Sequence, residues 1–182
     1  VLFRSNSAKS RASMLTEMEK EYEGYSLAVK TVMREHERGT LKGVHGPVAN
    51  LVKTDDRFTL AIETALGGAM QSIIVDTQEQ GKSAIEMLKR RDAGRATFLP
   101  IDTIRSYDLK NKPENDSGYL GTAYELSRFD PQFSGIFSNL LSRTVVAETL
   151  ADAVAMSKKN DNALRIVTLD GQMINAGGSM TG

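Results

Sequence analysis

An apolar stripe at helical spacing runs through the first part of the chain. Gaps of three and four residues alternate along it, as in the heptad seam of a coiled coil. Its members are Leu15, Met18, Tyr22, Tyr25, Val29, Val32 and His36. The stripe predicts a helix from about Ala12 to Arg38 that ends at Gly39, although Gly24 and the aromatic members weaken the seam. Two interpretations stay open: an amphipathic helix packed on its own domain, and the end of a longer coiled coil.

Beyond residue 40, short apolar runs alternate with amphipathic segments. The runs predict buried strands and the amphipathic segments predict helices. We expect strands at 71–75, 96–99, 144–147 and 165–169, after a turn and a short strand within 41–52. We expect helices at about 57–69, 77–93, 133–141 and 149–159. Asp170-Gly171 predicts a hairpin turn into a returning strand at 172–175. This alternation indicates an α/β fold, mixed with α+β character.

Two of these stretches repeat one order. In 73–77 and in 145–149 an apolar strand ends at an acidic residue, and a threonine follows at the spacing of a helix cap. The polar loop 111–118 lies between them. The economical interpretation is two α/β subdomains joined by that loop. The predicted organisation is the end of a coiled-coil arm at 1–38, a first subdomain at 39–112 and a second subdomain at 113–182.

The composition is that of a folding, soluble chain, and it excludes several kinds of chemistry. Of the 182 residues, 40% are hydrophobic and 25% are charged, with a net charge of zero. The absence of cysteine excludes disulfides, thiol catalysis and cysteine-based zinc sites. No apolar run approaches the roughly 20 residues of a membrane span, so we expect no membrane contact. The first five residues fit no pattern and are expected to be a frayed end or a foreign extension, not a secretory signal.

The zero net charge is the sum of unequal parts. Residues 82–112 carry 8 basic and 4 acidic residues, a net charge of +4, while the segments on either side are net negative. A polyanion contact is therefore expected on the middle segment. Its best candidates are Lys89, Arg90, Arg91 and Arg95. The alternative is a solvated helix end, where cations favour the helix dipole.

No arrangement of residues points to catalysis. Gly81-Lys82-Ser83 lacks the earlier glycine of a phosphate-binding loop, because position 76 is Asp. His36 and His45 fit no metal-ligand spacing and no catalytic triad. We therefore predict no catalytic residue, no metal ligand and no cofactor in this domain.

Glycines gather at the end of the chain, at Gly171, Gly177, Gly178 and Gly182. The hairpin turn accounts for Gly171, whereas Gly177-Gly178 follows a strand and has no obvious turn to serve. Glycine at such a position permits a positive φ or the close approach of another backbone. The alternative is a flexible tail.

Four separated motifs resemble one known family. They are Gly43-Val44-His45-Gly46-Pro47-Val48-Ala49-Asn50-Leu51, Ala61-Ile62-Glu63-Thr64-Ala65-Leu66-Gly67-Gly68, Gly94-Arg95-Ala96-Thr97-Phe98-Leu99-Pro100, and Gly177-Gly178-Ser179-Met180-Thr181-Gly182. In this order they resemble the hinge domain of structural maintenance of chromosomes (SMC) proteins, most like the bacterial condensin-type members. The resemblance covers about Leu15 to Gly182.

The resemblance implies a non-enzymatic dimerisation module. In the family, the hinge lies at the far end of an antiparallel coiled coil whose other end is an ATPase head. Two hinges form a ring-shaped, two-fold homodimer through glycine-rich strand ends. Gly171, Gly177 and Gly178 match the family pattern there, and Gly182 matches the first glycine of its last pair. The implied partners are a second copy and the returning coiled-coil strand of the same chain.

The resemblance also implies a cellular setting. Family hinges contact DNA weakly, often with a preference for single strands, and act in chromosome condensation and segregation. The expected location is the cytoplasm, at the nucleoid, and ATP binding is expected only of the full-length protein. Two alternatives from other classes remain: a small α/β enzyme with a pocket between two lobes, and a scaffold tethered by a coiled coil.

Overall fold

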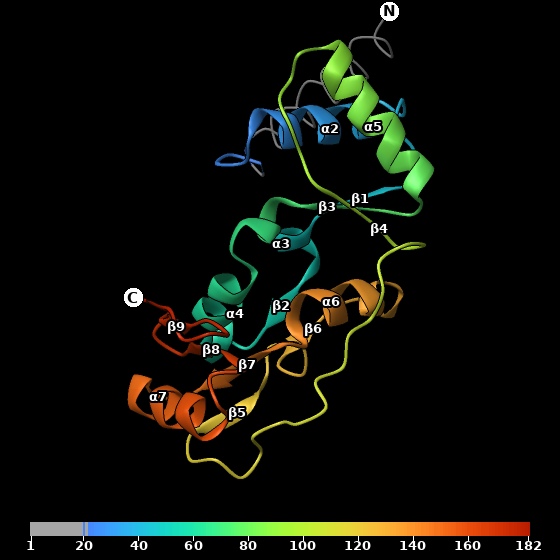
Figure 1. Ribbon diagram of the computed structural model, residues 1–182. Helices are drawn as coiled ribbons and strands as arrows, with labels where there is room; N and C mark the ends of the chain where they lie inside the picture. The colour runs from blue at the N-terminus through green and yellow to red at the C-terminus, as the bar shows by residue number, and fades with distance from the viewer. Residues whose placement is uncertain (1–19, 21) are drawn as a thin grey trace, which may run out of the picture. The chain divides into compact units, whose positions relative to one another are not determined.

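The computed structural model describes residue 20 and residues 22–182, and these form two compact units (Figure 1). Unit 1 holds the described residues up to Pro47 together with Gln71–Pro100, and unit 2 holds Val48–Met70 together with Ile101–Gly182. The structure thus divides the chain differently from the predicted break after residue 112. The segment 48–70 belongs to unit 2 because its helix packs against a strand near the end of the chain.

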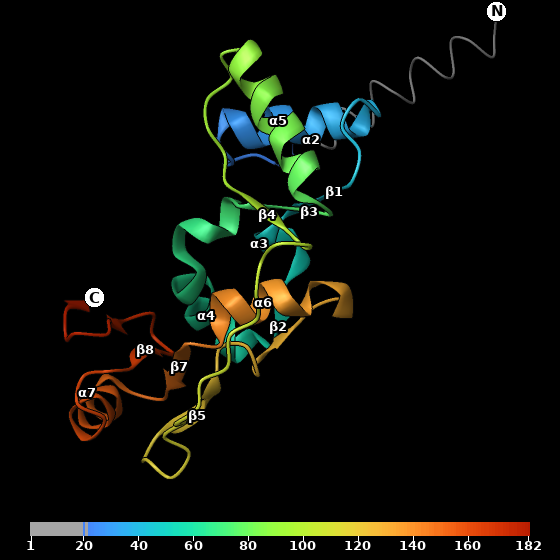
Figure 2. The same ribbon diagram turned by 45° about the vertical axis from the view of Figure 1, so that its right-hand side comes forward.

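Unit 1 is a three-stranded sheet covered by two helices. The strands β1 (Val44–Pro47), β3 (Ile73–Val75) and β4 (Phe98–Pro100) lie in the order β1-β3-β4, with β1 antiparallel and β4 parallel to β3. The helices α2 (Leu27–Glu37) and α5 (Gln78–Arg90) lie on the same side of this sheet (Figures 1 and 2). Their apolar faces meet the strands in a core that includes Val29, Val32, Ile73, Met87 and Leu88.

The predicted helix from Ala12 to Arg38 is not continuous in the described residues. Residues 22–24 form a turn, because Gly24 adopts a φ of +90° that leaves the helical region. A new helix then begins after Ser26, whose hydroxyl accepts a hydrogen bond from the Val29 N–H. Val29 and Val32 are almost fully buried in the core of unit 1. This burial agrees with the interpretation of an amphipathic helix packed on its own domain. The seam positions Leu15 and Met18 lie outside the described residues.

Unit 2 is a five-stranded sheet in the order β10-β9-β8-β7-β5. The β7–β8 pair is parallel and the other pairs are antiparallel. The strands are β5 (Tyr119–Thr122), β7 (Thr144–Ala147), β8 (Arg165–Thr168), β9 (Met173–Ile174) and β10 (Met180–Thr181). The helix α7 (Leu150–Lys159) packs on one face, where Ala153 and Met156 meet Val145, Ile166 and Ile174. The helix α4 (Thr59–Leu66) contacts β8 and the helix α6 (Ser134–Leu141).

The remaining elements of the described chain are short. They are α3 (Val48–Leu51), the paired strands β2 (Lys53–Thr54) and β6 (Ser127–Arg128), and three 3-10 turns, Asp56–Phe58, Gly67–Gln71 and Pro131–Phe133. None of the helices in the described part of the chain combines the length and the apolar composition that a membrane span requires. Helices and strands alternate as the sequence predicts, and the mixed α/β fold is confirmed.

The repeat expected from the sequence is confirmed and extends further than the pattern indicated. The order β1-β3-α5-β4 in unit 1 recurs as β5-β7-α7-β8 in unit 2, with parallel partners at its end. Each first strand carries a bulge at a glycine of positive φ, Gly46 at +133° and Gly121 at +140°. Thr77 and Thr149 cap the two helices as predicted. After this shared order, only unit 2 continues into two further strands, β9 and β10.

Candidate functional site

The chain ends in a hairpin whose turn contains Gly177 and Gly178. The Asn175 N–H donates to the Ser179 carbonyl at 2.8 Å, and the Gly178 N–H donates to the Asn175 carbonyl at 2.9 Å. Both glycines have positive φ values, +92° and +102°. The expectation that this pair serves no turn was therefore wrong. The reason is that the returning strand, β10, is only two residues long and leaves no alternating pattern in the sequence.

The terminal glycines differ in what surrounds their missing side chain. A Cβ on Gly171 approaches Leu60 Cγ at 3.0 Å, and a Cβ on Gly182 approaches Gln172 Cγ at 3.3 Å. A Cβ on Gly178 meets only Asn162 Cγ, at 3.9 Å, and one on Gly177 meets nothing within 4 Å. The chain's own packing therefore accounts for Gly171. Around Gly177 the space is open, so another backbone can approach it closely.

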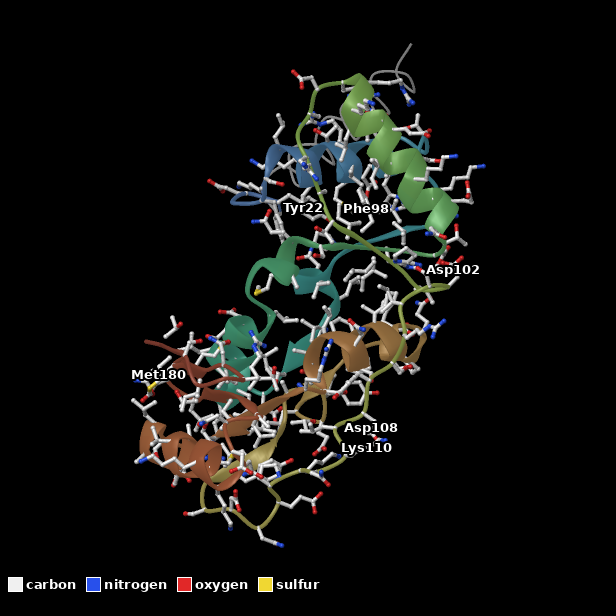
Figure 3. The ribbon with its side chains drawn as sticks, in the orientation of Figure 1. Tyr22, Phe98, Asp102, Asp108, Lys110 and Met180 are labelled. Carbon is white, nitrogen blue, oxygen red and sulfur yellow. The ribbon has the colours of Figure 1, made fainter. Side chains whose placement is uncertain are left out.

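A row of apolar side chains runs across the sheet of unit 2 and ends at Met180. Ile166 lies opposite Ile174, and Ile174 lies opposite Met180, so the three side chains share one face. α7 covers the first two, which are at most 3% exposed, whereas Met180 is 57% exposed. Figure 3 shows Met180 at the outer edge of unit 2. The apolar face thus continues beyond the part that α7 covers.

The backbone N–H and C=O of Met180 make no hydrogen bond to β9. Because Asn175 pairs with Ser179 through hydrogen bonds, the next hydrogen-bonded pair in this ladder is Met173 with Thr181. The N–H and C=O of Met180 therefore point away from β9, toward the outer edge of the sheet. Within the described residues, no strand pairs with this edge.

Unit 1 has a corresponding free edge along β4. The side chains of Phe98, Leu99 and Pro100 are half-buried, and Figure 3 shows Phe98 beside the core that also holds Tyr22. Their counterparts in the repeat, Ile166, Val167 and Thr168, are at most 1% exposed. The difference arises because β9 lies alongside β8, while within the described residues β4 has a neighbour only on its β3 side. This edge was not predicted, since an apolar run predicts a strand but does not indicate which of its two sides is paired.

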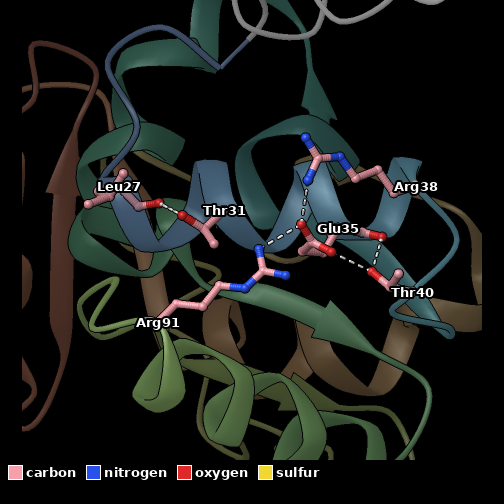
Figure 4. A network of polar contacts seen from close by, with 6 residues as sticks. All are labelled: Leu27, Thr31, Glu35, Arg38, Thr40 and Arg91. Atoms are coloured by element: carbon pink, nitrogen blue, oxygen red, sulfur yellow. Dashed lines mark hydrogen bonds and ion pairs between the residues drawn. The ribbon is translucent and has the colours of Figure 1, made fainter.

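The basic residues at the end of α5 fall into two groups. Lys89 and Arg90, in the last turn, and Arg95, beyond Gly94, are exposed. Arg91 instead donates from Nη1 to Glu35 Oε1 at 2.7 Å (Figure 4). Its charge is therefore directed at a carboxylate of unit 1 and is the least available of the four to an external polyanion.

Glu35 is a buried carboxylate held on three sides. Besides Arg91, it accepts hydrogen bonds from Arg38 Nη1 at 3.1 Å and from the Thr40 hydroxyl at 2.6 Å (Figure 4). Its side chain is only 3% exposed. The hydrogen bond from Arg91, followed by that from Thr40, lowers the pKa of Glu35 to about 2, against the opposing effect of burial. The sequence pattern missed this residue, because its partner Arg91 lies 56 residues away.

The histidine of β1 makes a local pair. His45 Nε2 lies 2.5 Å from Asp76 Oδ1, at the end of the neighbouring strand β3. Within the described residues, no group of three or more histidine, aspartate and glutamate side chains could hold a metal ion.

Comparison with known proteins places these features in one context. A sequence profile described as "SMC proteins Flexible Hinge Domain" matches residues 41–157. The Chromosome partition protein Smc of Bacillus subtilis (strain 168) is 38% identical over 179 residues, which are 96% of this chain and 15% of that protein. The protein of the same name from Methanocaldococcus jannaschii is 35% identical over 173 residues, or 95% of this chain and 14% of that protein.

Two solved structures of hinge domains are similar as well. An asymmetric dimer of the Geobacillus stearothermophilus SMC hinge domain matches with a TM-score of 0.85 and 38% identity, covering 97% of this chain and 73% of that one. The Pyrococcus furiosus SMC protein hinge domain matches with a TM-score of 0.72 and 25% identity, covering 92% and 86%. This chain spans about 15% of the length of the curated relatives.

Proposed function

The chain belongs to the family of SMC flexible hinge domains, and from that membership we propose that it is the module through which two SMC chains dimerise. The observation that carries the proposal is the pair of free apolar edges, β10 in unit 2 and β4 in unit 1. Strand addition satisfies the open backbone groups of such edges and buries the side chains beside them. The dimer of the Geobacillus stearothermophilus hinge supports the same role.

The two edges are compatible with a two-fold, closed dimer. If β10 of one copy joins β4 of the other, two-fold symmetry requires the reciprocal contact between the remaining edges. Two separate contacts then hold the pair, as in the ring-shaped homodimer that the family resemblance implies. In each contact, β10 supplies to β4 the neighbour that β9 supplies to β8 within unit 2. Gly177 and Gly178 permit the close approach of the two backbones.

We extend the proposal to the whole protein of which such a hinge is part. There the hinge joins two coiled-coil arms, pairs with the returning strand of its own arm, and leaves ATP hydrolysis to head domains. The setting is the bacterial cytoplasm at the nucleoid, in chromosome condensation and segregation. Support comes from the names of the curated relatives, which are chromosome partition proteins. Within the described residues, no specific observation favours the small-enzyme alternative.

The proposal predicts a dimer in solution that a bulky residue at Gly177 disrupts. We expect sedimentation equilibrium of the chain to give twice the mass of one copy, and Gly177→Val to shift the protein toward monomer, as we also expect for Gly178→Val. Gly39→Val is the matched control, because Gly39 also has a positive φ, +80°, and open surroundings, but lies on neither edge. An unchanged dimer in Gly177→Val, or equal loss in Gly39→Val, contradicts the assignment of Gly177 to the interface.

We also propose that DNA binds weakly at the exposed cations Lys89, Arg90 and Arg95. Arg90→Glu is expected to weaken binding of both a single-stranded oligonucleotide and a duplex, and to lower the slope of log affinity against log salt by about 1. Fluorescence anisotropy at several salt concentrations measures both quantities. The control is Lys158→Glu, which reverses an exposed cation in the last turn of α7. Equal affinity and slope in Arg90→Glu remove that residue from the DNA site.

A further inference from the structure

Among the described residues, the most accessible sulfur lies at one exposed position, Met180. The sequence has no cysteine and eight methionines, so sulfur oxidation can act only on thioethers. Four of the described methionines are buried, namely Met33, Met87, Met156 and Met173. Met70 is half-buried, and Met180 is 57% exposed. Among the described residues, Met180 is therefore the thioether that an oxidant in solution reaches most readily.

The same residue extends an apolar face toward a free edge. Met180 continues the row of Ile166 and Ile174, and its backbone N–H and C=O point away from β9. Oxidation turns a flexible apolar side chain into a polar sulfoxide, whose oxygen needs hydrogen-bond partners. The strand β4 presents the half-buried apolar side chains Phe98 and Leu99, and none of its three residues, Phe98–Pro100, carries a side-chain hydrogen-bond donor. A sulfoxide at position 180 is thus poorly matched to that edge.

We propose that Met180 is a site of reversible oxidation by peroxides, and that its oxidation weakens self-association. A lone pair of the sulfur attacks one peroxide oxygen, the O–O bond breaks, and an S–O bond forms. The leaving hydroxide takes the proton of the transferred hydroxyl, so the sulfur is oxidised by two electrons and hydrogen peroxide is reduced to one water molecule beside the sulfoxide. This inference rests on the proposed dimer, because the thioether matters only if β10 lies in the interface. Association in turn shields Met180, so the unassociated chain is the form that is oxidised.

Oxidation of Met180 therefore shifts the equilibrium between monomer and dimer toward the monomer. Dilution exposes the thioether and speeds its oxidation, and oxidised chains no longer re-associate readily. Reduction of the sulfoxide by methionine sulfoxide reductases restores the apolar side chain. Both reductases are needed for full reversal, because each acts on one sulfoxide epimer.

The test compares the wild-type chain with Met180→Leu, which keeps an apolar side chain but cannot be oxidised. Each protein is treated with hydrogen peroxide, oxidation at each methionine is quantified by peptide mass spectrometry, and the dissociation constant is measured by sedimentation. We expect full oxidation of Met180 to weaken association of the wild type at least tenfold, and reductase treatment to reverse it. Met180→Leu should keep its untreated affinity, although it retains Met14, Met18 and Met70.

Two further variants sharpen the result. Met180→Gln places a polar group of similar length at the edge and is expected to weaken association without oxidant, while Met70→Leu should respond to peroxide as the wild type does. A wild type that stays equally dimeric with Met180 fully oxidised overturns the inference and leaves the proposed dimer intact. Equal weakening of Met180→Leu by peroxide also overturns it, since another methionine is then responsible. A chain that is monomeric before any treatment refutes the proposed function itself.

Discussion

Met180→Lys is expected to convert the dimer into a monomer at micromolar concentration. Two-fold symmetry places the substituted residue in both contacts, so each dimer receives two buried ammonium groups. Burying even a neutral polar group without a partner costs about 2 kcal/mol or more, and a charged ammonium group costs more, so the two sites together lose at least about 4 kcal/mol. This corresponds to a dissociation constant at least about 1,000-fold higher. Sedimentation equilibrium over a concentration series measures the shift directly.

The control for this change is Ile85→Lys. Ile85 lies on α5, is 53% exposed, and belongs to neither free edge, so its replacement should leave the dissociation constant unchanged. Because Met180 is exposed, its replacement should also leave the thermal midpoint of the monomer within a few degrees of the wild type. A Met180→Lys chain that remains dimeric with the wild-type constant would falsify the assignment of β10 to the interface.

What the sequence could predict about the fold depended on how local each cause was. Thr77 and Gln80 predict the start of α5, because both hydrogen bonds of the capping box lie within four residues. The hairpin turn at Asp170-Gly171 is equally local, and Gly171 does adopt a φ of +80° there. The sequence does not predict that residues 48–70 belong to unit 2, because this depends on the packing of the helix α4 against the distant strand β8.

The same distinction between local and distant causes applies to the candidate site. The glycine motif and the basic run are visible in the sequence because each is contiguous. The pairing of Arg91 with Glu35, and the free edge of β4 beside Phe98, are properties of segments that meet only in the folded chain. This matters for function, because Arg91 belongs by sequence to the basic run and by structure to a buried ion pair. Reversing its charge therefore tests the stability of unit 1 before it tests DNA binding.

Glu35→Gln is expected to cause the largest loss of stability among these changes. The substitution keeps the shape of the side chain but removes the charge that Arg91, Arg38 and Thr40 hold. A pKa lowered from 4.5 to about 2 corresponds to about 3 kcal/mol, since one pKa unit is 1.36 kcal/mol. For a chain of this size that is a fall of about 9 °C in the thermal midpoint. Circular dichroism during heating measures it, with Glu37→Gln, an exposed carboxylate of the same helix, as the control.

The same pair predicts how stability depends on pH. The folded-state pKa of Glu35 lies below its ordinary value, so the unfolded chain takes up a proton first as the pH falls. The stabilisation is complete above about pH 4.5 and is lost progressively between pH 4.5 and pH 2. The wild type and Glu35→Gln should therefore differ most near neutral pH and converge in acid, whereas Glu37→Gln should follow the wild type throughout. If the gap between wild type and Glu35→Gln is the same at pH 7 and pH 2.5, packing and not the charge of Glu35 joins α2 to α5.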